Sequence, residues 1–524
     1  MTGDMENEAY EKLKERFEEL KHIRNAMSIL HKDSETNMAP GSELDRVRQL
    51  TVLSAMEHRM LNDPAMTQLL AQAEQDAGQL CKEDQRNLKL MRAEIENAAM
   101  PENLATEIAR LESEGRGLHT RLKPTGDWKQ IKDWYRYAFD TMRAIGQDKA
   151  QRRGFSSPYE ALLDTFSPGI SAEEVDRELG RMEKALPALI REAADRQKHQ
   201  DRPVPLTGPF PKEQQQELCR RIVEKMGFDF NRGRFDMIDG HPSSGGTSDD
   251  TRFTTDCDED NFLEAVYSTM HETGHAMYDQ NQPKSWRYQP AGGHLGMAIH
   301  ESMSRIMEIQ AGQTPEFFEF LSREAQDVFN RPNDPSLSAE NLRKLKQTVN
   351  PSYIRIYADE LTYPAHIILR HKLEKALVDG TLDIEDLPQA WNDEIKVLLG
   401  ITPPDASKGC MQDVHWPTGA IGYFPAYTLG DMGAAQLFAA ACRDKPEIRD
   451  ELRHGNFKPL REWLVDNVYS KGALMTPDEL LTAATGEELN ARYYLDHLSR
   501  RYLGRPYTPP GQSKAPEGPS NNMG

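Results

Sequence analysis

The chain has 524 residues, 38% of them hydrophobic, and a formal net charge of -20 at pH 7. This length exceeds what one small core needs, so we expect several domains or one large helical domain. The negative charge argues against a nucleic-acid partner, because phosphate binding needs a concentrated basic face. With a mean hydropathy of -0.72 and no long apolar run, the sequence contains no segment suited to spanning a membrane.

The first residues are acidic and helical in pattern, and they lack the basic and apolar regions of a secretory signal. The five cysteines form no CxxC pair, so neither a disulfide framework nor a zinc ribbon is indicated. These features predict a soluble protein of the cytoplasm that binds neither nucleic acid nor membranes.

From Glu6 to about Ala150, apolar residues recur at three- and four-residue spacing among many charged residues, which predicts successive amphipathic helices. Breaks are expected at residues 38–41, 62–64 and 100–101, because proline disfavours continued helix there. The pattern therefore predicts helical hairpins that pack over the rest of the chain.

A proline-rich connection at residues 202–211 precedes a short helix predicted over residues 213–226. Within residues 228–258 the β-prone segments FDMID and DTRFTTD are separated by turns rich in Gly and Ser, which predicts a small antiparallel sheet. Helical periodicity then continues to about Tyr502. The last residues, 508–524, are rich in Pro, Gly and Ser and are predicted to be disordered.

The strongest chemical signal is the stretch HETGH at residues 271–275. In a helix, residues four apart share a face, so His271 and His275 can offer two nitrogens to one metal ion while Glu272 reaches a water on it. Acidic residues before the stretch and apolar residues around it indicate a buried helix. A core helix that carries two histidines without a metal is the alternative.

A hydrolytic zinc site of this kind needs a third protein ligand. The best candidate is Glu301 in HESMSR, on a helix predicted over residues 297–311 after room for a loop. The HExxHxxGxxH pattern fails, because Tyr278 and Asn281 stand where its glycine and third histidine would be. An ordinary surface ion pair is the alternative for the glutamate.

Two arginines are candidates for holding a substrate carboxylate, which a guanidinium can bind through two parallel hydrogen bonds. Arg252 lies in DTRFT and would share a strand face with Asp250. Arg355 lies in IRIYAD, on a helix predicted to begin near Pro351, with Asp359 one turn later. Ordinary ion pairs explain both patterns about equally well.

The segment from Gly409 to Tyr427 mixes glycines, aromatic residues and single polar residues. Such a mixture is poor core material and is typical of a binding loop.

Together these stretches resemble the carboxypeptidase Taq family, the thermostable metallocarboxypeptidases. The matching elements follow the family's order: DTRFT, HETGHAMY, HESMSR, IRIYADELTY and GCMQDVHWPTGAIGYFPAYTLG. The resemblance covers roughly residues 5–507. It implies a mainly α, zincin-like and saddle-shaped domain with a small sheet beside a deep groove. It also implies that the N-terminal helical part, residues 5 to about 150, lies over that groove.

The resemblance also implies a homodimer that removes single residues from peptide C-termini with broad specificity. It implies zinc or cobalt on His271, His275 and Glu301, and Glu272 as the catalytic base. The donor set of two imidazoles and one carboxylate predicts that manganese can also take the place of zinc. The groove residues that it implies are Arg252, Arg355, His241, Gln412, His415 and Tyr423. The family's His-Pro-Phe element is His241-Pro242-Ser243 here, so one pocket wall lacks its aromatic residue.

The predicted mechanism is metal-assisted hydrolysis, in which the ion polarises the scissile carbonyl and lowers the pKa of its water to about 7. Glu272 takes the proton and returns it to the leaving amine, and Tyr423 or His415 donates to the oxyanion. One alternative is an oligopeptidase that cleaves internally or two residues from an end. The other alternative is a helical binding protein whose metal site is catalytically inactive.

Overall fold

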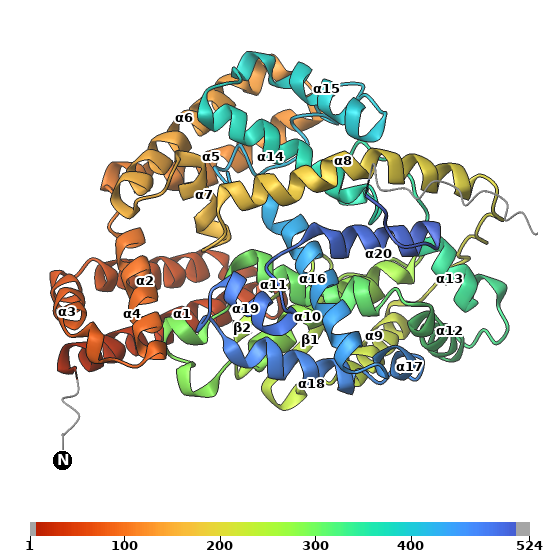
Figure 1. Ribbon diagram of the computed structural model, residues 1–524, viewed down its shortest axis with the longest axis horizontal. Helices are drawn as coiled ribbons and strands as arrows, with labels where there is room; N and C mark the ends of the chain where they lie inside the picture. The colour runs from red at the N-terminus through yellow and green to blue at the C-terminus, as the bar shows by residue number, and fades with distance from the viewer. Residues whose placement is uncertain (1–6, 510–524) are drawn as a thin grey trace, which may run out of the picture.

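The computed structural model describes residues 7–509 and is mainly helical with one small sheet, as predicted (Figure 1). The rest of the predicted tail, residues 510–524, lies outside the described residues. The helices are α1 (Glu8–Thr36), α2 (Glu43–Leu61), α3 (Pro64–Gln75), α4 (Lys82–Ala98), α5 (Glu102–Leu122), α6 (Trp128–Arg153), α7 (Pro158–Phe166), α8 (Ala172–Gln197), α9 (Lys212–Met226), α10 (Phe262–Gln280), α11 (Gly296–Arg305), α12 (Pro315–Val328), α13 (Ala339–Lys346), α14 (Tyr363–Asp379), α15 (Leu387–Leu399), α16 (Pro425–Asp444), α17 (Ile448–Leu452), α18 (Lys458–Asn467), α19 (Pro477–Thr485) and α20 (Ala491–Leu503).

The first four helices, α1 to α4, form a bundle at one side of the molecule, coloured red to orange in Figure 1. The predicted breaks are confirmed: the helices end at Thr36, Leu61 and Ala98. Asp63 accepts a hydrogen bond from the backbone of Ala65 and so caps the helix that starts at Pro64. The bundle buries a hydrophobic cluster of its own, separate from the main core.

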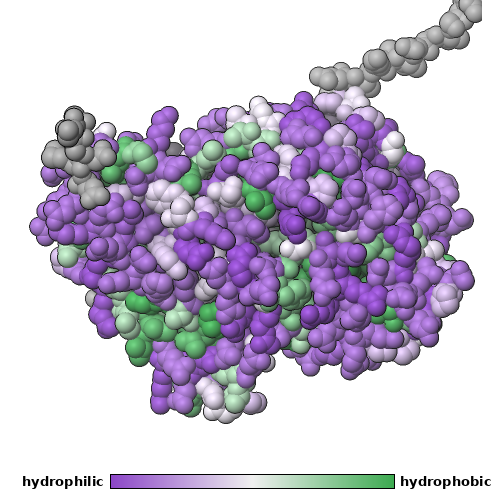
Figure 2. All heavy atoms as spheres, turned by 90° about the horizontal axis from the view of Figure 1, so that it is seen from below, coloured by the Kyte–Doolittle hydropathy of each residue, from purple (hydrophilic) through white to green (hydrophobic). Residues whose placement is uncertain are grey.

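The next helices, α5 to α8, pack with α14 and α15 at the top of the view in Figure 1. The remaining helices surround the sheet and the segment 271–301 in the lower half. The surface seen from below is largely hydrophilic, with smaller hydrophobic patches between (Figure 2). Among residues 7–509, no helix has both the length and the apolar character that crossing a bilayer requires.

The sheet contains β1 (Gly233–Met237), β2 (Ser243–Thr247) and β3 (Asp250–Thr255), in the spatial order β1-β3-β2. The prediction of a wholly antiparallel sheet is wrong in this detail, because β1 pairs with β3 in parallel and only β2 pairs antiparallel. Successive strands reverse direction, so β1 and β3 run the same way, and they become neighbours because β3 takes the centre. Strand β3 buries Phe253 and its threonines, whereas β2, with the sequence SSGGT, forms an edge. Helix α1 packs against this edge.

Helices α10 and α11 approach closely because of Gly274. A Cβ atom at that position would lie 2.6 Å from the carbonyl oxygen of Met303 and 2.6 Å from the Cα of Ser304. After Arg305, α11 continues as a π-helical turn, Ile306–Ala311, so the predicted helix over residues 297–311 is present with a changed pitch at its end.

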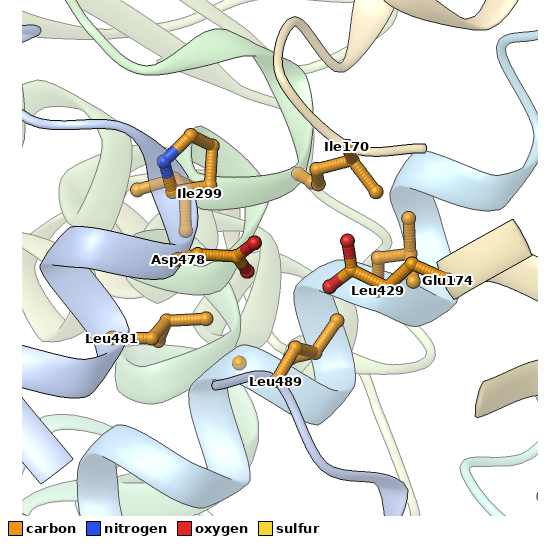
Figure 3. A pocket seen from close by; sticks show the side chains of 10 residues that line it. Ile170, Glu174, Ile299, Leu429, Asp478, Leu481 and Leu489 are labelled. Atoms are coloured by element: carbon orange, nitrogen blue, oxygen red, sulfur yellow. The ribbon is translucent and has the colours of Figure 1, made fainter. Parts of the chain in front are cut away.

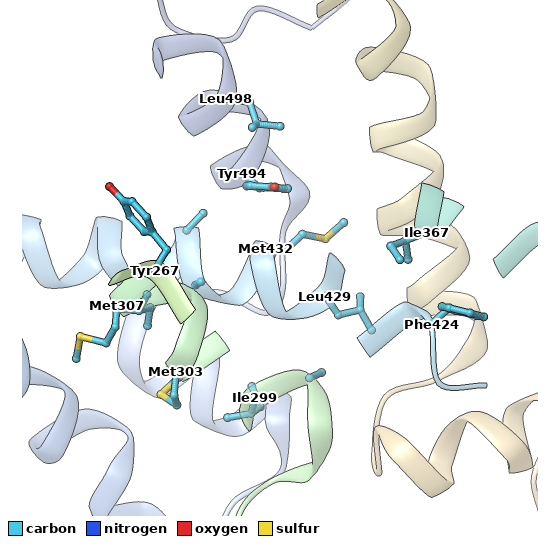
Figure 4. Packing of buried hydrophobic residues seen from close by; sticks show 14 of the residues in the cluster. Tyr267, Ile299, Met303, Met307, Ile367, Phe424, Leu429, Met432, Tyr494 and Leu498 are labelled. Carbon is cyan, nitrogen blue, oxygen red and sulfur yellow. The ribbon is translucent and has the colours of Figure 1, made fainter. Parts of the chain in front are cut away.

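Helix α16 runs through the middle of the main core and packs on α11 (Figure 4). Its glycines and alanines leave room for the side chains of neighbouring helices, among them Ile299 and Met303 of α11 and Tyr494 and Leu498 of α20. Because α10 and α16 carry apolar or small residues on all sides, they are buried helices. His271, Glu272 and His275 therefore stand on a buried helix of the main core.

Candidate metal centre and substrate site

The structure brings His271, His275 and Glu301 together, with one ligand atom of each within 4.8 Å of the others. The two Nε2 atoms are 3.2 Å apart, and Glu301 Oε2 lies 3.9 Å from His271 Nε2 and 3.7 Å from His275 Nε2. Two donors come from adjacent turns of α10 and the third from α11. Among residues 7–509 this is the one group of His, Cys, Asp and Glu side chains with metal-binding geometry.

These spacings fit a tetrahedral divalent ion. Ligand atoms about 2.0–2.1 Å from a zinc ion in a tetrahedron are about 3.3 Å apart, so the observed separations need changes of only a few tenths of an ångström. Two imidazoles and one carboxylate leave a fourth position open, which is the donor set of a catalytic rather than a structural site. The donor set contains no thiolate, since the cysteines of the described residues lie elsewhere.

His271 is oriented through its second nitrogen. Its Nδ1 lies 2.9 Å from Glu308 Oε2, and Glu308 in turn accepts a 2.6 Å hydrogen bond from Arg305, which donates to Asp431 at 2.6 Å. Burial opposes charge on His271, yet Glu301 and Glu308 raise its pKa to about 9. The same carboxylate–imidazole contact fixes Nε2 toward the ligand cluster.

The second ligand, His275, is held by stacking. Its ring lies parallel to that of His300, with centroids 4.2 Å apart and an angle of 15°. Burial holds the pKa of His275 well below its usual range, so its ring is neutral and can bind a metal. Glu272 is only 7% exposed, and burial raises its pKa despite the neighbouring His271.

Arg355 is buried and lies beside Asp413, to which it donates two hydrogen bonds of 3.1 and 2.9 Å. Arg370 binds the other oxygen of the same carboxylate at 2.8 and 2.5 Å. The predicted pair with Asp359 is wrong, because residues 350–358 are irregular apart from one 3-10 turn and do not have the spacing of an α-helix. Asp359 instead accepts hydrogen bonds from the backbone of Asn350, Leu361 and Thr362.

Arg252 stands on β3 and shares a face with Asp250, as predicted. It donates from Nε at 2.9 Å and from Nη2 at 2.7 Å to that carboxylate. Its side chain is 19% exposed, compared with 9% for Arg355. Among the described residues Nη1 of Arg252 has no hydrogen-bond acceptor, so this guanidinium keeps donors for a ligand.

Gln412 is placed differently from the prediction of a substrate-binding residue. Its Oε1 accepts from the backbone N–H of Arg355 at 2.9 Å. Its Nε2 donates to the carbonyl oxygens of Tyr353, Lys408 and Gly409 at 3.0 to 3.2 Å. Gln412 therefore joins the backbone of Tyr353 and Arg355 to its own loop at Lys408 and Gly409.

His415 and Tyr423 belong to an aromatic cluster that also contains Phe424 and Tyr427. The rings of His415 and Tyr423 are 5.4 Å apart, and Tyr423 lies 5.2 Å from Tyr427. Burial raises the pKa of Tyr423, and the negative charge of Glu301 adds to this effect. Burial lowers the pKa of His415 to about 4, and the charges that act on this ring are those of Asp413 and of nearby arginines and a histidine.

His241 lies in the turn between β1 and β2 and is exposed, with Nδ1 2.6 Å from the carbonyl oxygen of Pro242. It is close enough to Glu272 to oppose the rise in that carboxylate's pKa.

Comparison with known proteins decides the family. The family model of the carboxypeptidase Taq (M32) metallopeptidases matches residues 12–502 of the sequence. The chain belongs to the carboxypeptidase Taq family. Carboxypeptidase 1 of Bacillus subtilis is 33% identical, with coverage of 95% of this chain and 99% of that protein. Thermostable carboxypeptidase 1 of Thermus thermophilus is 32% identical over 94% of this chain and 98% of its own length.

Comparison with solved structures indicates the same family. The chain is similar to metallocarboxypeptidase 1 of Trypanosoma cruzi, with a TM-score of 0.91 and 33% identity over 95% of this chain and 99% of that chain. An M32 carboxypeptidase from Deinococcus radiodurans gives a TM-score of 0.87 at 30% identity, with coverage of 95% and 99%. The protein is thus a metallocarboxypeptidase, a peptide hydrolase that uses a divalent metal ion.

The departure from the family's His-Pro-Phe element has a structural counterpart. Ser243, in the position of the aromatic residue, accepts a 2.6 Å hydrogen bond from the buried ammonium group of Lys32 on α1. Glu35 completes the cluster, 2.6 Å from Lys32 and 2.7 Å from Ser243. At this position the chain therefore has a polar cluster to which α1 of the N-terminal bundle contributes Lys32 and Glu35.

Sequence reasoning missed the residues that orient the site: Glu308, Asp431, Asp413 and Arg370. A signal existed for the first, because Glu308 follows Glu301 by seven residues, close to two helical turns, and so returns to the same face. The other three are far from their partners along the chain and carry no local pattern. The enclosed pocket in Figure 3 lies beside α11, and none of its lining residues is a predicted site residue.

Proposed function

We propose that this carboxypeptidase releases single amino acids from peptide C-termini, with broad specificity for the residue removed. The observation that carries the proposal is that the His271–His275–Glu301 cluster lies near the two arginines bound to Asp413, which are Arg355 and Arg370. Tyr363 and Tyr427 lie close enough to both Glu301 and Arg355 for both charges to act on their pKa values. An exopeptidase needs this neighbourhood, because it must hold a free carboxylate beside the bond that it cuts.

The proposed ion is Zn2+ on His271, His275 and Glu301, with Co2+ or Mn2+ able to replace it, because these nitrogen and oxygen donors suit all three metals. When bound, the ion would polarise the peptide carbonyl and make a neighbouring water more acidic. Glu272 follows His271 directly and is buried, and the charges of His271 and Glu301 act on its carboxyl group. Its proposed role is to take a proton from water and return it to the leaving amine.

Tyr423 is the proposed hydrogen-bond donor to the oxyanion. The charge of Glu301 acts on its hydroxyl, whereas the charges that act on His415 belong to the Asp413 side. His415 then supports the tyrosine by ring packing. Removal of such a donor costs about 100- to 1,000-fold in kcat in other enzymes, so Tyr423→Phe should show a large effect and His415→Phe a smaller one.

Arg252 and Arg355 are the proposed partners of the substrate's terminal carboxylate, with His241 nearby at the exposed edge. A guanidinium suits this task because its planar donors match both carboxylate oxygens. The two arginines differ in a way that experiment can use: Arg252 keeps a free Nη1, whereas Arg355 also donates to Tyr363 at 3.0 Å. Arg252 is therefore expected to contribute more direct binding, and Arg355 more orientation.

The deciding experiment compares N-blocked peptides that carry a free C-terminal carboxylate with the same peptides amidated at the C-terminus. We expect free single amino acids as products and a loss of most activity on amidation. Arg252→Ala or Arg355→Ala should lower kcat/KM for free acids by about 2–3 kcal/mol and reduce the difference between acid and amide. Equal cleavage of acids and amides would overturn the proposal in favour of an oligopeptidase.

Metal analysis tests the assigned roles. Exhaustive chelation should abolish activity, and zinc, cobalt or manganese should restore it. Glu272→Gln should keep the metal and lose turnover, whereas Glu301→Ala should lose metal affinity itself. A Glu272→Gln variant without metal beside a Glu301→Ala variant with it would reverse the roles. Normal metal content with no peptidase activity in the unmodified protein would favour a binding protein instead.

Assembly and location complete the proposal. Residues 5–507 are proposed as one catalytic domain, which acts as a homodimer in the cytoplasm. Sedimentation analysis of the purified chain tests the dimer, because a monomer at micromolar concentration contradicts it.

A further inference from the structure

Glu374 on α14 is a buried carboxyl without a cationic partner. Its exposure is 0%, and within residues 7–509 it takes part in no ion pair. A carboxyl group in such a place is costly unless hydrogen bonds compensate for the lost water. The groups that donate hydrogen bonds to Glu374 therefore indicate its role.

Two of the three donors come from the loop that leads to Tyr423. The indole Nε1 of Trp416 donates to Oε2 at 2.7 Å, and the backbone N–H of Gly422 donates to Oε1 at 2.6 Å. The third donor is the hydroxyl of Tyr159, 3.2 Å from Oε1. Glu374 thus holds the loop at two points, the second of them one residue before Tyr423.

The loop has little freedom at this second point. Gly422 has a φ of +90°, and a Cβ atom there would lie 2.8 Å from the backbone nitrogen of Leu163, so only glycine fits. The backbone of the residue before Tyr423 is therefore fixed by α7 on one side and by Glu374 on the other. The Tyr423 ring then packs edge-on against Phe166, with centroids 4.9 Å apart.

The carboxyl group is itself held in place. Tyr159 lies 2.9 Å from Nδ1 of His371, and Nε2 of His371 lies 2.7 Å from Asp176 Oδ1. This chain of hydrogen bonds joins α7, α8 and α14, so Glu374 cannot turn away without breaking it. Burial raises the pKa of Glu374 to about 7, against the influence of its three donors.

We propose that Glu374 is a positioning residue for the hydrolytic reaction: through the Gly422 N–H and the Trp416 indole it fixes Tyr423 for hydrogen bonding to the oxyanion. This inference rests on the proposed role of Tyr423. Glutamine is the informative replacement, because it keeps the size of the side chain but has one acceptor oxygen. The donors Trp416 and Gly422 bind opposite oxygens, so one of them must face the amide NH2 group and lose its acceptor.

The experiment is a double-mutant cycle on the zinc-loaded full chain with Glu374→Gln, Tyr423→Phe and the combination. We expect Glu374→Gln to lower kcat by about 10- to 100-fold, because a small misplacement of a reacting group has effects of this size, with KM and zinc affinity within about twofold of the unmodified protein. In the Tyr423→Phe background the same change should have almost no further effect.

Glu178→Gln is the matched control. Glu178 is also 0% exposed and accepts a backbone hydrogen bond, from Ala491 at 2.9 Å. Unlike Glu374 it pairs with two arginines, Arg177 and Arg181, and its partners among the described residues lie outside the Tyr423 loop. Its replacement should leave kcat within about twofold. If Glu374→Gln does not fold, Trp416→Phe removes one of the two anchors while it leaves the carboxyl in place, and the same loss of additivity is expected.

The outcomes separate the two hypotheses. A kcat close to that of the unmodified protein in Glu374→Gln, or an equal further loss in the Tyr423→Phe background, overturns the role of Glu374. Full activity in Tyr423→Phe overturns the proposed role of Tyr423 and, with it, this inference. A slow Tyr423→Phe beside a fast Glu374→Gln overturns only the latter.

Discussion

Gly430 on α16 determines how closely this helix can approach Glu301, the proposed third metal ligand. A Cβ atom at position 430 would lie 2.6 Å from Glu301 Cγ and 2.7 Å from its Cβ. Carbon atoms in contact are ordinarily about 3.5 Å apart, so alanine requires a displacement of about 0.9 Å. Ligand distances in metal sites tolerate about 0.2 Å, which is several times less. The atoms at risk are close to the backbone of α11, so a side-chain rotation alone cannot relieve the clash.

Gly430→Ala should therefore weaken zinc binding by about 10- to 100-fold, or about 1.4–2.7 kcal/mol, and lower stability by about 1–3 kcal/mol. Zinc affinity is measured by competition with a chromogenic chelator, and stability by thermal unfolding with and without zinc. The stabilisation conferred by zinc should decrease in the variant together with the affinity.

Gly433→Ala is the control on the same helix crossing. A Cβ atom there would lie 2.5 Å from Ser302 Oγ, a hydroxyl that can rotate, and the added methyl group does not touch the ligand. It should lower stability with little change in zinc affinity. The reasoning is refuted if both variants lose zinc equally, or if folded Gly430→Ala binds zinc as tightly as the unmodified protein.

Three further predictions follow from buried charges. Glu308→Gln should weaken zinc binding by about 10-fold in the same chelator assay, because an amide orients His271 less firmly than a carboxylate. Lys32→Met should lower the free energy of unfolding by about 1–3 kcal/mol in urea, because Ser243 and a carboxylate lose their buried partner. Burial, then Asp478, raises the pKa of Glu174 to about 7, and the two carboxyl groups face each other in Figure 3. The folded state therefore binds this proton more tightly than the unfolded state, so stability should fall as pH rises from about 4.5 to 7, and Glu174→Gln should remove up to about 3 kcal/mol of that fall.

Each of these has a contradicting result. Unchanged zinc affinity in Glu308→Gln would mean that the second nitrogen of the ligand imidazole needs no carboxylate. A Lys32→Met variant as stable as the unmodified chain would mean that α1 docks without this cluster. Parallel stability curves between pH 5 and 8, with and without Glu174, would place its titration outside this range.

The sequence predicted the parts of the site that depend on local geometry. Helical spacing alone places His271 and His275 on one face, and the coordination chemistry of zinc requires a third ligand such as Glu301. The breaks in the N-terminal helices were also predictable, because proline acts on its own neighbours.

The partners that come from distant segments were not predictable. Arg355 was paired with Asp359 because an α-helix would bring them together, but the chain is irregular there and Asp413, 58 residues away, takes that place. The direction of one strand pair was wrong for a similar reason: β1 and β3 are paired in parallel because β3 lies at the centre of the sheet, and the sequence alone did not show which strand would be central. Nothing in the local pattern of Glu374 showed that its donors lie in the loop of Tyr423.

The separate core of the α1–α4 bundle has a consequence for how the molecule unfolds. The three proposed metal ligands stand on α10 and α11, outside the bundle. The bundle is joined to the rest of the molecule through hydrogen bonds such as those of Lys32 to Ser243, Gly246 to Ser28, and Arg86 to the carbonyl of Ala473. Two cooperative units can then lose structure at different denaturant concentrations. Amide hydrogen exchange should show the bundle opening first, while the zinc-bound helices remain protected, so zinc would stabilise only one of the two units.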